Sequence, residues 1–257
     1  MISFVGAGPG APDLITLRGA QRLAAADVVV WASSLVPDAL LEHCRPGVEV
    51  HDSKAMTLEE VTAVYADHPD AAIARLHSGD PTVFGAIAEQ IDWCLANERS
   101  YEIVPGVSSL HAAAAAAGRE LTVPAVSQTV VLTRLADRTS ASMRRGEGVA
   151  AVAVHGATMA VFLSAARPDA LRDELLGPGS AYSPDTPALI ASRVSWPDEQ
   201  LVETTVGELA VDLQRLGTTR TVLVLVGDAL GRSPAARRSH VYAPDYEHTF
   251  RGPAPAP

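Results

Sequence analysis

Three glycine-containing loops hold the residues whose types are best suited to binding chemistry. They are Gly6-Ala7-Gly8-Pro9-Gly10, Ser78-Gly79-Asp80-Pro81 and Pro105-Gly106-Val107-Ser108-Ser109. Glycine lets the main chain approach a ligand closely, and two of the loops add small hydroxyl groups or a carboxylate that form directional hydrogen bonds. A single Gly-Asp-Pro sequence is more typical of a turn than of a site. Together, however, the three loops indicate a site for a small ligand.

The first loop formally fits the dinucleotide-binding pattern Gly-x-Gly-x-x-Ala, which ends at Ala11. Pro9 removes a backbone N–H that a pyrophosphate would need. Pro12 delays the next helix, so that its N-terminus does not lie where the phosphates would sit. The second expected strand, residues 28–31, also lacks an acidic residue at its end to bind a ribose. We therefore expect neither NAD nor FAD, and the loop either contacts another ligand or is a structural turn.

The sequence assigns no side chain to catalysis and no set of side chains to a metal ion. It shows no nucleophile triad and no paired acids. The eight histidines form no His-x-His or His-x-x-x-His pair, and Cys44 and Cys94 form no Cys-x-x-Cys motif. Pairs with such spacings are typical of zinc sites. We therefore expect no metal site, and the catalytic residue is unknown.

The three loops follow strands in a chain that alternates between strand and helix. Short apolar runs predict strands at 2–5, 28–31, 48–51, 71–76 and 101–104. Helical spacing and a capping box predict helices at 14–26, 36–41, 57–67, 84–97 and 109–117. This alternation predicts an α/β domain with a mostly parallel sheet. In such a sheet, ligands bind at the carboxyl ends of the strands, where the three loops lie.

In the second half of the chain, strands follow one another more directly. We predict strands at 127–133, 157–163, 188–194, 200–205 and 221–226, and helices at 168–176 and 206–216. This order favours a mixed sheet packed by helices. We place the domains at 1–123 and 124–257. The second domain ends in an irregular, proline-rich tail, whose last residues, 251–257, we expect to be disordered.

Composition limits the classes of partner. The 257 residues include 20 basic and 30 acidic ones, a net charge of −10, which argues against nucleic-acid and membrane binding. No apolar run approaches the length of about 20 residues that spans a bilayer. The opening residues lack the basic segment of a signal peptide, so we expect a cytoplasmic protein. Lys54 is the only lysine. Any anion site must therefore consist mostly of arginines, which bind carboxylates in a bidentate manner.

The three loops, in this order and spacing and with Gly85 after the second, resemble those of the tetrapyrrole methylase family, which uses S-adenosylmethionine. Residues 32–36, 120–124, 127–134 and 196–199 are most similar to the branch of that family that methylates C11 of precorrin-4 or cobalt-precorrin-4 in cobalamin biosynthesis. The resemblance covers about residues 1–230. It implies two α/β domains with the cofactor in the cleft between them, and a homodimer.

The resemblance also implies which residues contact S-adenosylmethionine and its product S-adenosylhomocysteine. In the first domain they are Pro9, Ser78, Gly79, Asp80, Val83, Ser108 and Ser109. In the second domain they are Phe162 and Leu163 against the adenine, and Ala191 and Arg193 on the far side. Asp80 is the best electrostatic partner for the cationic sulfonium, with a turn-stabilising role as the alternative.

The implied substrate is an anionic tetrapyrrole with several carboxylates, for which Arg134 and Arg138 are the candidate ligands. An in-line transfer from a sulfonium to an electron-rich ring carbon depends chiefly on positioning and on the exclusion of water. Two alternatives remain open. One is a methylase of the same family that acts on another ring carbon or on uroporphyrinogen. The other is a nucleotide-binding module without turnover.

Overall fold

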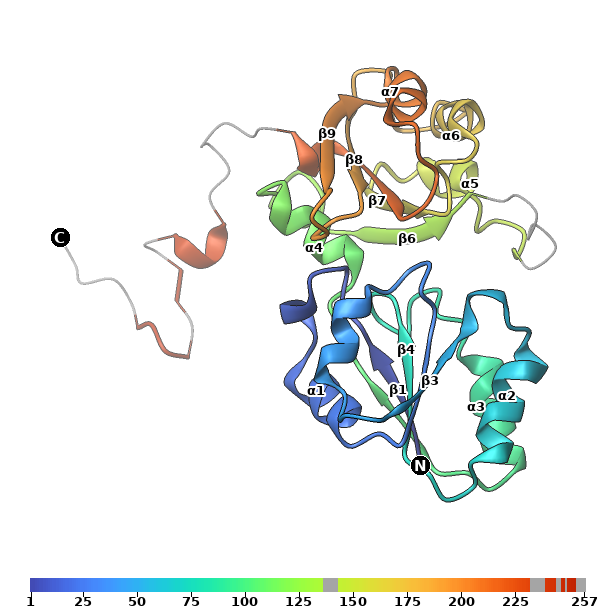
Figure 1. Cartoon of the computed structure of the whole chain (residues 1–257). Coiled ribbons are helices and arrows are strands. Elements are labelled where there is room, and N and C mark those ends of the chain that lie inside the picture. Colours follow the sequence, from blue (N-terminus) through green and yellow to red (C-terminus); the bar gives the residue numbers. More distant parts are fainter. Residues whose placement is uncertain (136–142, 232–238, 244–245, 248, 253–257) are drawn as a thin grey trace. The chain divides into compact units, whose positions relative to one another are not determined.

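The computed structural model describes residues 1–135, 143–231, 239–243, 246–247 and 249–252 (Figure 1). The chain forms two compact units. The first comprises Met1–Ala116 and Arg193–Gln200, and the second comprises Ala117–Ser192 and Leu201–Pro257. Of the tail expected to be disordered, residues 253–257 lie outside the described part. None of the helices in the described ranges combines the length and the apolar character that a membrane crossing requires.

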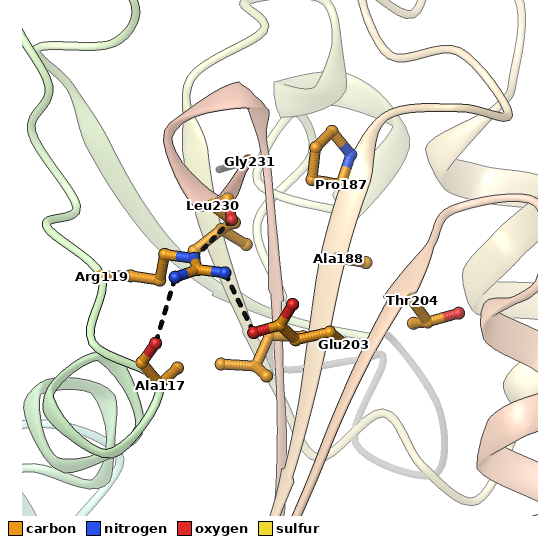
Figure 2. Close-up of a pocket in the computed structure, with 9 residues that line it drawn as sticks. Ala117, Arg119, Pro187, Ala188, Glu203, Thr204, Leu230 and Gly231 are labelled. Atoms are coloured by element: carbon orange, nitrogen blue, oxygen red, sulfur yellow. Dashed lines mark hydrogen bonds and ion pairs between the residues drawn. The ribbon is translucent and has the colours of Figure 1, made fainter. Parts of the chain in front are cut away.

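Residues 117–119, which directly follow the first segment of the first unit, are bonded to the second unit. The guanidinium of Arg119 donates to the carbonyl oxygens of Leu230 and Ala117, at 2.7 and 3.3 Å, and to a carboxylate oxygen of Glu203 at 2.9 Å. These groups line a cavity of about 140 Å³ in the second unit (Figure 2). Because two of its nitrogens donate to Leu230 and Glu203, Arg119 ties residues 117–119 to this unit.

The first unit contains a five-stranded sheet in the order β3-β2-β4-β1-β5, in which every pair of neighbours is parallel. Its strands are β1 (Ile2–Gly6), β2 (Val28–Trp31), β3 (Glu49–Asp52), β4 (Ile73–His77) and β5 (Tyr101–Val104). Its helices are α1 (Leu17–Ala24), α2 (Leu58–Asp67), α3 (Ala88–Ala96) and α4 (Ser109–Ala116), with short 3₁₀ turns η1 (Pro12–Leu14), η2 (Asp38–His43) and η3 (Ser53–Ala55). Residues of α1 and η2 pack in one apolar cluster with the sheet, and residues of α2 and α3 pack in another.

Local chemistry sets the ends of these helices. The side chain of Thr57 accepts from the backbone N–H of Glu60, and the Glu60 carboxylate accepts from the N–H of Thr57, so the predicted capping box starts α2. The helix expected to begin at residue 84 begins only at Ala88. Phe84 and Ala86 have φ angles of 54° and 49°, which are left-handed and incompatible with an α-helix.

The second unit contains a mixed five-stranded sheet in the order β6-β7-β10-β8-β9. Strand β7 is parallel to β6, whereas β10 is antiparallel to both β7 and β8. Its strands are β6 (Val130–Arg134), β7 (Thr158–Phe162), β8 (Pro187–Ser192), β9 (Gln200–Thr205) and β10 (Val222–Val226). Its helices are α5 (Val149–Ala153), α6 (Pro168–Leu175) and α7 (Leu209–Leu216), with 3₁₀ turns η5 (Asp228–Leu230) and η6 (His240–Tyr242). Helices α5, α6 and α7 contribute to one apolar cluster with the strands. The sequence analysis did not predict α5.

A histidine is buried at the end of β4, directly before the second glycine loop. The side chain of His77 is packed against Phe4, with ring centroids 6.0 Å apart, and the residue is 7% exposed. Its Nε2 atom has no hydrogen-bond partner among the described residues. Burial and the nearby charge of Arg75 lower the pKa of His77 to about 3, against the opposing effect of a hydrogen bond with the backbone of Gly85. The imidazole is therefore neutral in the folded protein at neutral pH.

This neutral histidine makes the stability of the fold depend on pH. Between pH 6.5, the ordinary value for histidine, and about pH 3, the unfolded chain binds a proton at His77 that the folded chain does not. The free energy of unfolding should therefore fall more steeply with acidification in the wild type than in His77→Gln. Urea denaturation of both proteins between pH 7 and about pH 4 measures the difference. Parallel curves for the two proteins would contradict this assignment.

Candidate functional site

The three glycine loops of the sequence analysis meet at one edge of the parallel sheet. Strands β4, β1 and β5 are neighbours, and each loop leaves the carboxyl end of its strand. The N–H of Gly79 donates to the carbonyl of Gly8 at 2.8 Å, and the N–H of Gly8 donates back to Gly79 at 3.2 Å. This pair is an isolated antiparallel bridge between the first and second loops. The φ angles of Gly8 and Gly79 are +79° and +67°, a conformation that favours glycine.

Three glycines allow this edge to close. A Cβ atom on Gly106 would lie 2.2 Å from the carbonyl oxygen of Gly79 and 2.7 Å from Cα of Gly6. A Cβ atom on Gly6 would lie 2.5 Å from Cα of Gly106. All three distances are shorter than real Cβ contacts, and the opposing atoms are main-chain atoms that cannot rotate away. We define Gly6, Gly79 and Gly106 as the glycine junction.

A fourth glycine, Gly85, fixes the turn that follows the second loop. A Cβ atom there would lie 2.1 Å from the carbonyl oxygen of Pro81. The spacing Gly-Asp-Pro-x-x-x-Gly therefore has a steric cause in this chain. Val83, one of the predicted cofactor contacts, lies inside this turn and is half-buried, with its N–H donating to the carbonyl of Asp80 at 3.2 Å.

Asp80 joins the second loop to the third. Its Oδ2 accepts from the N–H of Gly106 at 2.9 Å, and its Oδ1 accepts from the N–H of Thr82 at 2.8 Å and from the Thr82 hydroxyl. Partial burial raises the pKa of Asp80, but the hydrogen bonds from Thr82 and Gly106 outweigh that effect and lower it. The carboxylate is therefore ionised at neutral pH and holds the junction together. This geometry supports the turn-stabilising role and also places a negative charge at the edge of the sheet.

The remaining predicted contacts of the first unit surround the junction. Ser108 is buried and precedes α4, where its hydroxyl lies 3.4 Å from the N–H of Leu110 and its carbonyl accepts from two further amides of the first turn. Ser78 and Ser109 are half-buried, and Pro9 is buried. Cα of Ser108 and the N atom of Ser109 each lie 3.7 Å from the position of a Cβ on Gly79. The structure thus brings Pro9, Ser78, Gly79, Asp80, Ser108 and Ser109 together.

The segment Arg193–Gln200 packs on the first loop, an arrangement that the sequence analysis missed. The indole N–H of Trp196 donates to the carbonyl of Pro9 at 3.0 Å, and the Ser195 hydroxyl accepts from the N–H of Ala11 at 2.9 Å. A Cβ on Gly10 would lie 2.2 Å from the Trp196 ring. In the sequence, residues 196–199 stand out only through their resemblance to the family, which does not indicate that they contact the first loop.

Arg193 is held beside this indole ring. Its guanidinium carbon lies 4.0 Å from the centroid of the Trp196 ring, a cation–π contact, and its Nε donates to Asp198 at 2.6 Å. Arg193 also has a φ angle of 48°. Its described contacts hold the segment on the glycine loop, so its predicted role toward the cofactor stays a prediction.

The residues of the second unit that are predicted to contact the cofactor or the substrate lie on β6, at the end of β7 and on β8. Arg134 is paired with Phe162 in the β6–β7 ladder, and Leu163 follows directly with a φ angle of 51° and 68% exposure. Ala191 is buried in β8, opposite Leu223 of β10. Arg138 lies outside the described residues. The roles of these residues toward a cofactor or a substrate stay predictions.

The edge of the sheet offers main-chain groups and hydroxyls rather than a nucleophile. Its described residues include backbone amides and carbonyls of the three loops, serine hydroxyls and one ionised carboxylate, and the neutral His77 lies buried beneath it. Such a surface suits a ligand that carries its own reactive group, because the protein supplies positioning and a negative charge. These groups fit a cationic, hydrogen-bonding cofactor such as S-adenosylmethionine.

Comparisons with known proteins agree with this geometry. Residues 1–210 match the sequence profile of the Tetrapyrrole (Corrin/Porphyrin) Methylases. Precorrin-4 C(11)-methyltransferase of Mycobacterium tuberculosis strain H37Rv is 44% identical over 232 residues, 89% of this chain and 91% of that protein. Cobalt-precorrin-4 C(11)-methyltransferase of Methanocaldococcus jannaschii is 40% identical over 252 residues, 97% and 95% of the two chains.

Two solved structures show the same architecture. The X-ray structure of a cobalamin biosynthetic enzyme, cobalt precorrin-4 methyltransferase, is similar with a TM-score of 0.84 and 40% identity, covering 90% of this chain and 95% of that one. Uroporphyrin-III C-methyltransferase of Thermus thermophilus, complexed with S-adenosylhomocysteine, is similar with a TM-score of 0.73 and 26% identity, covering 89% and 98%.

The glycine junction leads to a prediction about stability. Gly106→Ala should lower the free energy of unfolding by about 1–3 kcal/mol, the usual cost of overpacking, because its methyl group meets the main chain of Gly79 and Gly6. Gly252→Ala is the matched control, since no atom lies within 4 Å of its Cβ position. Urea denaturation measures both. Equal free energies of unfolding for the two variants would show that the loops can move apart to accommodate a methyl group without loss of stability.

Proposed function

The chain belongs to the tetrapyrrole (corrin/porphyrin) methylases, and from this premise we propose that it methylates C11 of precorrin-4 or cobalt-precorrin-4 with S-adenosylmethionine as the methyl donor. The observation that carries the proposal is the sequence identity of 40–44% with relatives named for the C11 reaction, over most of both chains. The uroporphyrin-III methyltransferase is only 26% identical. The reaction therefore belongs to corrin ring biosynthesis.

S-adenosylmethionine supplies an electrophilic methyl group on a sulfonium when it is bound. The chain's own part is to bind and orient the two reactants and to exclude water. In the first unit, the hydroxyl groups of Ser78 and Ser109, which are half-buried beside the glycine junction, are the proposed hydrogen-bonding groups. The ionised Asp80 contributes a favourable potential for a cation while it holds the loops together. No residue is assigned as a general base.

The substrate carries carboxylates, for which we propose arginines as ligands. Arg134 lies in β6 directly beside Phe162, and Arg138 follows four residues later in the chain. A planar guanidinium binds a carboxylate through two parallel hydrogen bonds. Phe162, Leu163, Ala191 and Arg193 are our candidates for further cofactor contacts. A homodimer, which rests on the sequence resemblance, and a cytoplasmic location, which rests on the sequence features described above, are part of the same proposal.

The first test of the proposal is binding and turnover. S-adenosylhomocysteine should raise the melting temperature of the protein by mass action, and NADH should not. Incubation with methyl-labelled S-adenosylmethionine and either precorrin-4 or cobalt-precorrin-4 should then transfer one methyl group to the ring, located by NMR of the product. Methylation at another carbon would assign the chain to another reaction of the family. Binding without transfer to either substrate would identify a non-catalytic module.

The second test concerns the proposed substrate ligand. Arg134→Lys should raise the KM for the tetrapyrrole by about 10-fold or more while it leaves the affinity for S-adenosylhomocysteine nearly unchanged, because an ammonium cannot reproduce the bidentate contact. Arg220→Lys, at an exposed position in the same unit, is the matched control. Steady-state kinetics and calorimetric titration separate the two effects. A loss of affinity for S-adenosylhomocysteine with an unchanged KM for the tetrapyrrole would show that Arg134 contacts the cofactor and not the substrate.

A further inference from the structure

One cluster of histidine and acidic side chains lies apart from the glycine loops. Glu49 and His51 are on the edge strand β3 of the first unit, and His68 caps the C-terminal end of α2. Residues i and i+2 of a strand share a face, so Glu49 and His51 point the same way. In the described ranges, these are the only three histidine, cysteine or acidic residues whose ligand atoms all lie within 4.8 Å of one another.

Both imidazoles converge on one carboxylate. Nε2 of His51 lies 2.7 Å from Oε1 of Glu49, and Nε2 of His68 lies 3.2 Å from Oε2. Two ligands at about 2.0–2.1 Å from a tetrahedral zinc ion are roughly 3.3 Å apart. The carboxylate and each imidazole are therefore already near the separation that a shared ion requires.

A hydrogen bond with the backbone determines which ring nitrogen of His68 faces Glu49. Nδ1 of His68 lies 2.8 Å from the carbonyl oxygen of Val64. A carbonyl oxygen only accepts, so Nδ1 donates in this contact. Nε2 is therefore the nitrogen that faces the Glu49 carboxylate and that can serve as a ligand atom.

The backbone around the cluster holds the ligands in place. The guanidinium of Arg99 donates to the carbonyl oxygens of His68 and Ala71, each at 2.8 Å, and so fixes the end of α2. On β3, the parallel ladder with β2 places Glu49 beside Val28. The contact of His68 with the Val64 carbonyl is the kind of outer hydrogen bond that orients a metal-binding histidine.

We propose that Glu49, His51 and His68 form a binding site for a divalent transition metal, with Zn²⁺ as the best match. Two neutral imidazoles and one carboxylate are a common zinc ligand set that leaves a fourth position for water. The side chains are 52%, 26% and 25% exposed, respectively, so an ion and its water have access. The net charge of −10 also favours cation binding. The ion would link the edge strand to α2.

The site is separate from the proposed methyl transfer. Glu49 and His51 are on β3, whereas the glycine loops leave β4, β1 and β5. In the sheet, β2 lies between β3 and β4, the nearest of these three strands. The sequence analysis expected no metal because the chain lacks the short histidine and cysteine spacings of zinc sites. Glu49 and His51 are two residues apart, but the third ligand, His68, is distant in the sequence.

Calorimetric titration of the tag-free, full-length protein with zinc chloride tests the proposal. The wild type should bind one ion at this site, and His51→Gln and His68→Gln should each weaken that binding by more than about 10-fold, at least the cost of losing an outer-shell partner. His155→Gln, at an exposed position of the second unit, should bind as the wild type does. Circular dichroism without metal verifies that the variants are folded.

Zinc X-ray absorption identifies the ligands. Nitrogen and oxygen neighbours at about 2.0–2.1 Å, without sulfur at about 2.3 Å, would support the site. Sulfur ligation would overturn it, since a cysteine would then hold the ion. The proposal also fails if the wild type binds no zinc, or if the two histidine variants bind as the wild type does. None of these readouts depends on methyltransferase activity.

Discussion

The close approach of three main-chain segments at the carboxyl edge of the parallel sheet is the constraint on which the first unit depends. At Gly6 and Gly106, a Cβ atom would collide with main-chain atoms of the neighbouring loops. At Gly79 there is space for a Cβ atom, but the positive φ angle of 67° favours glycine. This contact fixes where β1, β4 and β5 end. It also leaves no space for side chains longer than hydrogen at Gly6 and Gly106.

Asp80 shows how electrostatics follows from that constraint. Its two oxygens accept hydrogen bonds from loops that the glycines have already brought together, and these bonds keep the carboxylate ionised despite its partial burial. The structural and electrostatic interpretations of Asp80 are therefore not alternatives. The same negative charge that joins the loops contributes to the potential at their surface. A cation bound there would meet a carboxylate that needs no reorganisation.

Much of this arrangement was predictable because it depends on local patterns. Strands β2 and β5 have the predicted bounds, with Pro105 and Gly106 directly after β5, and the capping box of α2 forms as expected. The late start of α3 was not predictable, because left-handed φ angles at Phe84 and Ala86 contradict their helix propensity. The bonds of Arg119 and the packing of Trp196 on Pro9 and Gly10 join residues far apart in sequence. No local pattern reports such contacts.

The position of Trp196 also places a fluorescent side chain in contact with the first loop. The chain has three tryptophans, and Trp31 and Trp93 belong to or pack against the two apolar clusters of the first unit. Trp196 instead has its indole N–H on the carbonyl of Pro9, its ring against Gly10, and the Arg193 guanidinium over its face. Indole fluorescence responds to hydrogen bonding and to nearby charge. The protein therefore carries an intrinsic fluorophore whose emission reports on the conformation of its glycine-rich loop.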